Sequence, residues 1–153
     1  KRIQKKKEKQ GGNHDDDLMF IKNVMESNTV SRKDIESLSK IDHPLFSFKY
    51  LRDVSIDKCK EYSFFHDFLM RLQKLSELGW KEIRVSHRHS YGMEKIPVEE
   101  IIPQNQLPNF VTKEGDVDVF RAVGDNRTFV GLQEGKIFYI FFIEANFGDI
   151  CPH

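Results

Sequence analysis

The sequence predicts an α+β domain in which helices pack on one face of a small, mostly antiparallel sheet. One long segment, Tyr62–Trp80, has apolar residues at steps of three and four, as in an amphipathic helix. Residues 117–143 contain three short apolar runs separated by turn residues, which indicates a meander of consecutive strands. The last run, Ile137–Ile143, is almost wholly apolar, so we expect a central strand with both faces buried.

The chain divides by composition into three parts. Residues 1–17 pass from a basic run to three consecutive aspartates, which is typical of a disordered, charged tail. Residues 18–44 predict an N-terminal helical extension, in which one helix follows the tail and a second begins after Ser31. Residues 45–153 contain the α+β domain itself.

The elements of this domain follow from local patterns. Residues 45–51 alternate between apolar and polar side chains, as a half-buried strand does. In the long helix, the stripe of phenylalanines and leucines predicts core contacts, and Gly79 predicts the C-terminal stop. The pattern of residues 81–85 does not decide which type of secondary structure this short segment forms. Three prolines interrupt residues 97–108, where we expect a single helical turn at 98–102.

Two tight turns connect the strands of the meander. The first is Gly124-Asp125-Asn126, and the second contains Glu134, Gly135 and Lys136. These residues supply the positive φ angles that short hairpin loops need.

The composition predicts a soluble protein without a membrane span. Ile137–Ile143, the longest apolar run, is about a third of the roughly 20 residues that a spanning helix needs. Cys59 and Cys151 form neither a disulfide framework nor a metal-site spacing, and no signal peptide is recognisable, which favours a reduced cytoplasmic setting. Residues 41–153 carry 14 Lys and Arg against 17 Asp and Glu, so net charge does not indicate nucleic-acid binding.

Two arginines flank the first turn of the meander. Arg121 ends one strand and Arg127 opens the next, so a hairpin brings them near each other. Two guanidinium groups there can clamp a phosphate and stabilise the charge that develops on it. The alternative is that they form ion pairs on the sheet surface with Asp118, Asp125 or Glu144.

A second polar segment contains His87, Arg88 and His89. Two imidazoles at this spacing can act as general acid and base near neutral pH, or begin a metal site that His153 and Asp149 complete. They can also be exposed loop residues without a role. The chain has no P-loop, dinucleotide fingerprint, nucleophile elbow or zinc-protease helix, which disfavours the common nucleotide and hydrolase chemistries.

The motif Phe120-Arg121-Ala122-Val123-Gly124-Asp125-Asn126-Arg127, followed by a strand, an acidic-Gly turn and an apolar strand, resembles the C-terminal half of RelE/ParE-superfamily toxins. The similarity lies mainly in residues 118–150. Members typically show an aromatic-Arg pair, a Gly-Asp turn and a second Arg, and they order a strand, a helical part and a meander, as do residues 45–150.

This resemblance implies a toxin of a toxin–antitoxin pair that cuts mRNA without a metal or other cofactor, commonly on the ribosome. The cut would be attack of a ribose 2′-OH on the adjacent phosphate. Arg121 and Arg127 would then hold the phosphate, and His153 or His89 would move protons. His87, Arg88 and Lys136 would contact RNA. The ParE branch implies DNA gyrase as the target instead.

Two other classes of function stay open from the residues alone. One is a non-catalytic interaction or regulatory module, in which the arginine-bearing sheet binds a protein partner. The other is a metal-dependent enzyme built on His87, His89 and His153.

Overall fold

A computed structural model describes residues 19, 32–102 and 106–151 of the chain. The chain forms two compact units, residues 1–41 and residues 42–153. In the first, helix α2 (Arg32–Ser39) lies where the second helix of the extension is predicted. The predicted tail and, apart from Met19, the first predicted helix lie outside the described residues.

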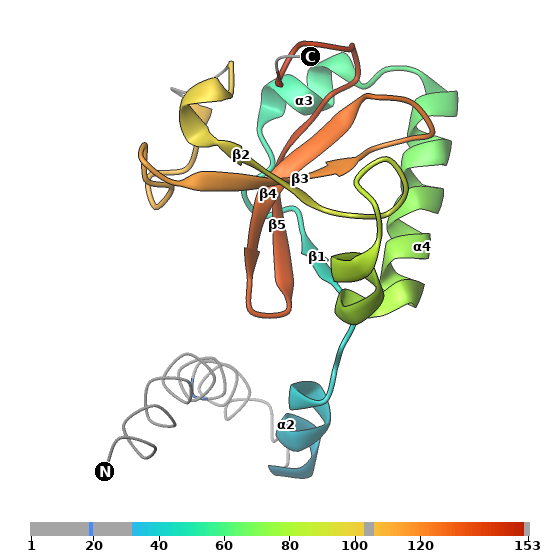
Figure 1. Cartoon of the computed structure of the whole chain (residues 1–153), viewed down its shortest axis with the longest axis vertical. Coiled ribbons are helices and arrows are strands. Elements are labelled where there is room, and N and C mark those ends of the chain that lie inside the picture. The colour runs from blue at the N-terminus through green and yellow to red at the C-terminus, as the bar shows by residue number, and fades with distance from the viewer. Residues whose placement is uncertain (1–18, 20–31, 103–105, 152–153) are drawn as a thin grey trace. The chain divides into compact units, whose positions relative to one another are not determined.

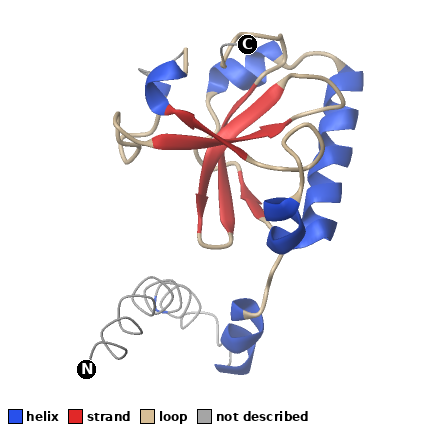
Figure 2. Ribbon diagram, in the orientation of Figure 1, coloured by secondary structure: helices blue, strands red, loops and turns tan. Residues whose placement is uncertain are grey.

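The second unit contains a five-stranded mixed sheet (Figures 1 and 2). Its strands are β1 (Leu45–Ser47), β2 (Glu94–Pro97), β3 (Asp116–Arg121), β4 (Thr128–Glu134) and β5 (Ile137–Ile143). The order is β1-β5-β4-β3-β2, in which β1 pairs with β5 in parallel and the other neighbours are antiparallel. The α+β class is therefore confirmed, and β5 has a neighbour on each side.

Helix α4 (Tyr62–Val85) covers one face of the sheet with Phe64, Phe68, Leu72 and Leu75, which meet buried side chains of β3, β4 and β5. The prediction that the whole stripe lies in the core is wrong for Phe65 and Leu69, which are 41% and 67% exposed. The helix contacts the sheet along one side only, and these two residues lie outside that contact.

The opposite face of the sheet packs against segments with little regular structure. Val117, Val119 and Val130 contact the 3₁₀ turn η1 (Val98–Glu100) and the C-terminal Ile150. The single helical turn expected there is confirmed. Helix α3 (Asp53–Lys58) was not predicted; its Ser55 accepts a hydrogen bond from the Ile143 N–H and ties α3 to β5.

Gly79 ends the first stretch of helical geometry in α4, as predicted. Its φ of 84° and ψ of 162° are non-helical, and a second helical stretch runs from there to Val85. A Cβ at this position would lie 3.0 Å from the Asp42 carbonyl oxygen, and the Trp80 N–H donates to that same oxygen at 2.8 Å. Gly79 therefore allows close approach of the segment before β1, and residues 81–85 belong to α4.

Three further local predictions differ from the structure. The first strand is shorter than expected, because β1 covers only Leu45–Ser47. Strand β2 was not expected between the prolines and the histidines. Gly135 has the positive φ that the second turn needs, whereas Gly124 in the first turn does not adopt one.

Among the described helices, α4 included, none is both long enough and apolar enough to cross a bilayer.

Candidate functional site

The connection from α4 to β2 brings the polar segment to the end of β3. Strand β2 pairs antiparallel with β3, with Glu94 opposite Val119, so the residues that precede β2 lie beside the residues that end β3. In Figure 1 this yellow-green connection loops between α4 and β2. The histidines and Arg121, far apart in sequence, therefore meet at one edge of the sheet.

The connection itself, Ser86–Gly92, is a closed turn. The His87 carbonyl accepts hydrogen bonds from the N–H groups of Ser90 and Gly92, each at 2.9 Å. The Tyr91 N–H donates to the Ser86 hydroxyl at 3.2 Å. A Cβ at Gly92 would lie 2.2 Å from the Ser86 carbonyl oxygen, so the turn closes only because this residue is glycine.

Arg121 and His89 are in direct contact. The Arg121 guanidinium donates to the Asn126 carbonyl at 3.0 Å and lies 3.2 Å from the His89 Nδ1. Since a guanidinium cannot accept, Nδ1 must be the acceptor, and neutral His89 carries its proton on the outward Nε2. The pKa of His89 is lowered, first by desolvation and then by the positive charges of Arg121 and Arg88, so the imidazole is neutral at neutral pH.

The other two residues of the triplet extend this cluster. Arg88 forms an ion pair with Glu94 at 2.9 Å, and the rings of His87 and His89 stack with centroids 5.2 Å apart. The His89 N–H donates to the His87 Nδ1 at 3.3 Å. His87, Arg88 and His89 are all exposed, so the cluster presents hydrogen-bond donors to solvent.

Arg127 does not join this cluster. Arg121 is opposite Thr128 in the register, and the Ala122 N–H donates to the Arg127 carbonyl, so the two arginine side chains leave the hairpin on opposite faces. Arg127 forms an ion pair with Asp125 at 2.9 Å and donates to the Ala145 carbonyl at 2.9 Å. Its guanidinium lies 4.8 Å from the centre of the Phe64 ring. The alternative of a surface ion pair with Asp125 is thus what the structure shows for Arg127.

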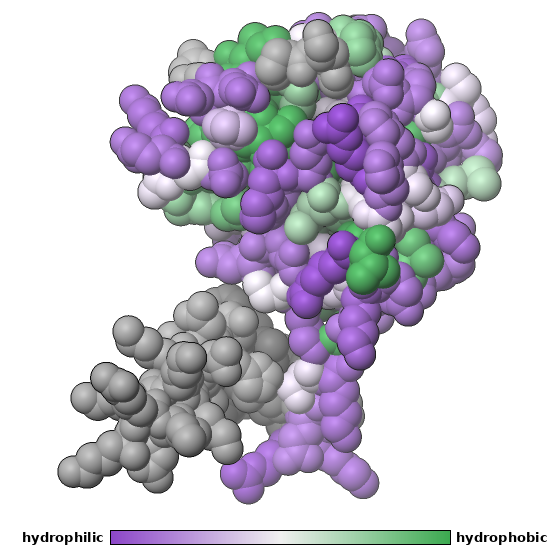
Figure 3. Space-filling view, in the orientation of Figure 1, coloured by the Kyte–Doolittle hydropathy of each residue, from purple (hydrophilic) through white to green (hydrophobic). Residues whose placement is uncertain are grey.

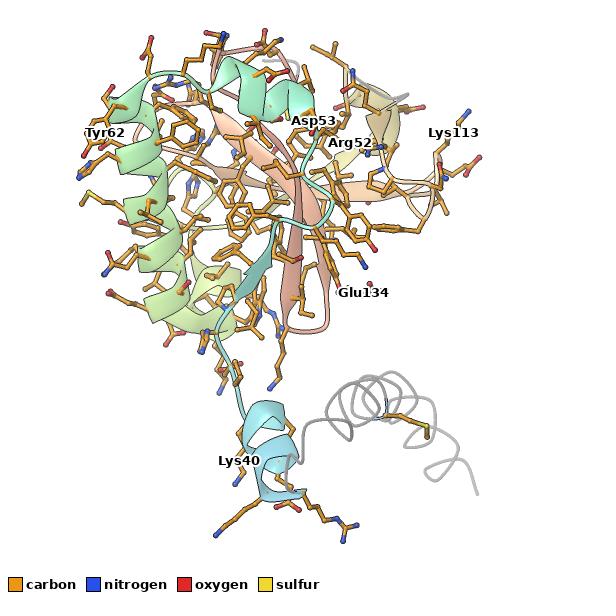
Figure 4. All side chains as sticks on the ribbon, turned by 180° about the vertical axis from the view of Figure 1, so that it is seen from behind. Lys40, Arg52, Asp53, Tyr62, Lys113 and Glu134 are labelled. Atoms are coloured by element: carbon orange, nitrogen blue, oxygen red, sulfur yellow. The ribbon has the colours of Figure 1, made fainter. Side chains whose placement is uncertain are left out.

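Lys136 lies at the other end of the sheet. It follows β4, and a seven-residue strand separates it from Thr128 by about 20 Å at ~3.3 Å per residue. Glu134, labelled in Figure 4, marks the same end. The Lys136 carbonyl accepts from the Leu45 N–H and from the Trp80 indole N–H, so its backbone joins β1 and α4 to this turn. Lys136 is not brought near Arg121.

His153 lies outside the described residues, but the chain before it is fixed by Glu144. This fully buried carboxylate accepts hydrogen bonds from the N–H groups of Thr128, Ile150 and Cys151, between 3.1 and 3.3 Å. Burial raises the pKa of the Cys151 thiol to about 11, and the thiol accepts from the Thr128 hydroxyl at 3.5 Å. Since Thr128 is opposite Arg121, Glu144 holds the C-terminal segment beside the cluster.

Sequence reasoning missed Arg71. This residue of α4 donates to the carbonyls of Ser90 and Val123, at 2.7 and 2.9 Å, and its guanidinium lies 4.7 Å from the centre of the Tyr91 ring. It therefore joins the helix to both sides of the cluster. Nothing in the helical periodicity sets Arg71 apart from the other polar residues of α4; its carbonyl partners come from the tertiary structure.

Within residues 32–102 and 106–151, no group of three or more His, Cys, Asp or Glu side chains is arranged to hold a metal ion. His153, which the metal-dependent alternative requires, is not among these residues.

No protein-family model, curated protein or solved structure matches the chain. Arg121 is partly exposed, and its recorded polar partners within the described part of the chain, the Asn126 carbonyl and His89, are both neutral. A guanidinium without a carboxylate partner, beside a neutral imidazole, suits an incoming anion.

Proposed function

We propose that the chain is a metal-independent endoribonuclease toxin of the RelE/ParE kind, which cleaves mRNA by attack of a ribose 2′-OH on the adjacent phosphate. The observation that carries this proposal is the contact between Arg121 and His89. It brings a cation that has no carboxylate partner among the described residues and a base that is neutral at physiological pH to one exposed edge of the sheet. Phosphate transfer needs both groups.

The chemistry follows from the two side chains. An RNA phosphate draws the Arg121 guanidinium away from His89, because a charge-assisted bond to an anion is stronger than one to a neutral imidazole. The freed Nδ1 of His89 then accepts the proton of the 2′-OH as its oxygen attacks phosphorus. The bond from phosphorus to the 5′-oxygen breaks, and that oxygen takes up a proton from water, which leaves a 2′,3′-cyclic phosphate and a 5′-hydroxyl.

The order of elements in the second unit supports the proposal. A short strand, two helices and then an antiparallel run of strands follow one another along residues 45–143. This is the order that the resemblance to the toxins implies. The detailed assignment of the fold to that family is part of the proposal.

The residues of the resemblance divide into two groups. We assign phosphate binding to Arg121 and proton transfer to His89, with His87 and Arg88 beside them as RNA contacts. Arg127 is assigned a positioning role, since Asp125, Ala145 and Phe64 hold it on the other face of the hairpin. Lys136 has no role in this site.

The acidic balance of residues 41–153 bears on the substrate. A protein with a net negative charge binds free RNA weakly, because phosphate contacts supply most of the affinity. We therefore propose mRNA held by the translating ribosome as the substrate, in the cytoplasm, and a cognate antitoxin as the regulatory partner.

The test is cleavage of a labelled mRNA by the purified protein, both free and in translating ribosomes, with a chelator present. Wild type should leave fragments with cyclic phosphate ends, and a 2′-deoxy nucleotide at the cut should block cleavage. Arg121→Ala should lose about 100- to 1,000-fold in rate, as when one group that stabilises a transition-state anion is removed.

Lys113→Ala is the matched control, since Lys113 is exposed and precedes β3 at its other end (Figure 4). It removes one positive charge and should cleave as wild type does. If folded Arg121→Ala cleaves RNA as fast as wild type, the proposed site is wrong.

A second function is favoured by the surface of α4. Tyr62 and Leu69 are 83% and 67% exposed, and Phe65 and Met70 are exposed as well. Tyr62 projects from the start of the helix in Figure 4. On the face seen in Figure 3, hydrophobic side chains are otherwise scattered among hydrophilic ones. Apolar residues along one helix suit a protein partner. If the protein cuts no RNA, we therefore propose a protein-interaction module in place of a nuclease.

A further inference from the structure

Arg71 of α4 bridges the two chain segments that carry His89 and Arg121. Its Nη1 donates to the Ser90 carbonyl at 2.7 Å, and its Nη2 donates to the Val123 carbonyl at 2.9 Å. Ser90 follows His89 directly in the chain. Val123 is two residues after Arg121, at most about 7 Å along the chain. One guanidinium group therefore sets how far the turn that carries His89 lies from the hairpin that carries Arg121.

The N–H bonds within the Ser86–Gly92 turn do not set this distance. Those described above end on other residues of the same turn, so they determine its shape but not its position against β3. The pairing of β2 with β3 begins only at Glu94, five residues after His89. The bridge from α4 is the hydrogen-bonded link that lies nearest to His89 on this side.

An arginine suits this bridge for geometric reasons. Its donors form a planar, rigid fork, so a single side chain can reach two carbonyl groups at once. The Tyr91 ring, whose centre is 4.7 Å from the guanidinium carbon, covers one face of the fork. A lysine at this position would keep the positive charge, but a single ammonium group on a flexible stem does not reproduce the fork.

We propose that Arg71 is a positioning residue, which holds His89 in contact with Arg121 by joining the Ser90 and Val123 carbonyls. Within the described part of the chain, its recorded contacts are these two carbonyls and the Tyr91 ring. It therefore acts through the backbone and neither binds the phosphate nor moves a proton. Its effect on cleavage rests on the proposed endoribonuclease function, whereas its effect on the position of His89 does not.

The test compares two substitutions in α4 that separate the bridge from the charge. Arg71→Lys keeps the charge and loses the bridge, whereas Lys74→Ala removes the charge of an exposed residue and keeps the bridge. The pKa of His89 is lowered first by desolvation and then by nearby positive charges, chiefly those of Arg121 and Arg88. Within the described part of the chain, the charge of Arg71 is not among these causes.

NMR titration of His89 measures whether the contact persists. In Arg71→Lys the pKa should rise toward the usual value of about 6.5, because His89 moves away from Arg121. In Lys74→Ala it should stay as in wild type. Circular dichroism verifies the fold of each variant. A His89 pKa in folded Arg71→Lys equal to that of wild type overturns the positioning role.

A double substitution shows whether Arg71 acts through Arg121. In Arg121→Ala the contact is already absent, so adding Arg71→Lys should leave the His89 pKa as it is in Arg121→Ala alone. An equal rise in both backgrounds overturns the proposal, since Arg71 would then act on His89 by another route.

Cleavage of mRNA in programmed ribosomes measures the effect on the reaction. Arg71→Lys should lower kcat about 10- to 100-fold, as displacement of a catalytic group by about 1 Å does, with little change in KM. Lys74→Ala should cleave as wild type does. An unchanged kcat in Arg71→Lys overturns the positioning role and leaves the nuclease in place. If wild type cleaves no RNA, the nuclease is wrong, and the titration of His89 still decides whether Arg71 holds it against Arg121.

Discussion

The two arginines of the first turn differ in their partners, although the sequence presents them as a pair. Arg121 contacts a neutral histidine and a carbonyl, whereas Arg127 is held by Asp125, by the Ala145 carbonyl and by the Phe64 ring. An arginine whose charge is already balanced gains less from an incoming phosphate. The different roles proposed for Arg121 and Arg127 therefore rest on their different partners and not on their residue type.

His89 should titrate below the usual histidine pKa of about 6.5. Desolvation and the charges of Arg121 and Arg88 all favour the neutral ring. Since the unfolded chain then binds more protons between the lowered pKa and about 6.5, this residue makes the folded state less stable as pH falls through that range. NMR titration of the ring measures the shift, and Arg121→Ala should move the pKa part of the way back up. A His89 pKa above 6.5 in wild type would contradict the contact between His89 and Arg121.

Arg127→Ala should lower the free energy of unfolding by about 1–2 kcal/mol, because it removes charged hydrogen bonds from a side chain that is mostly buried. Asp125→Ala should cost less, about 0.2–1 kcal/mol, since that carboxylate is more than half exposed. Denaturant unfolding measures both.

Cleavage by folded Arg127→Ala should fall less than about 10-fold, against about 100-fold or more for Arg121→Ala. A loss as large as that of Arg121→Ala in a protein that is still folded would place Arg127 in the reaction.

At the scale of elements, the Ser86–Gly92 turn decides whether His89 reaches Arg121. Gly92→Ala places a Cβ 2.2 Å from the Ser86 carbonyl oxygen, so the turn must open. Cleavage should fall about 100-fold, the cost of moving a catalytic group by about 1 Å. Circular dichroism and the NMR signal of His89 separate this local change from unfolding. If Gly92→Ala cleaves as fast as wild type and its His89 NMR signal is unchanged, the Ser86–Gly92 turn does not determine the position of His89.

The elements also show how far the sequence predicts this structure. Strong periodicity identified α4, and turn residues located the β4–β5 hairpin, because both signals are local. The parallel pairing of β1 with β5 depends on contacts more than 80 residues apart, and no local pattern indicates it. The faces of Arg121 and Arg127 depend on register, which a shift of one residue inverts. The sequence indicated Arg88 and His89 as candidate site residues. The ion pair of Arg88 with Glu94 and the contact of His89 with Arg121 became visible only in the folded structure.

On the scale of the whole molecule, RNA binding has to come from a local cluster of residues and not from the overall charge. Residues 41–153 have a net charge of −3, from 14 basic against 17 acidic residues, so no general attraction draws RNA to this unit. Arg71, Arg88 and Arg121 nevertheless lie around one turn. A small basic cluster on an acidic unit favours an RNA that another macromolecule holds in place, such as mRNA on the ribosome.

The most direct test is growth of a bacterial host when the whole chain is tightly induced, beside Arg121→Ala and Lys113→Ala at equal levels of folded protein. Wild type and Lys113→Ala should arrest growth and leave mRNA fragments with cyclic phosphate ends, whereas Arg121→Ala should do neither. Arrest by Arg121→Ala equal to that of wild type, or arrest by wild type with intact mRNA, would contradict the account.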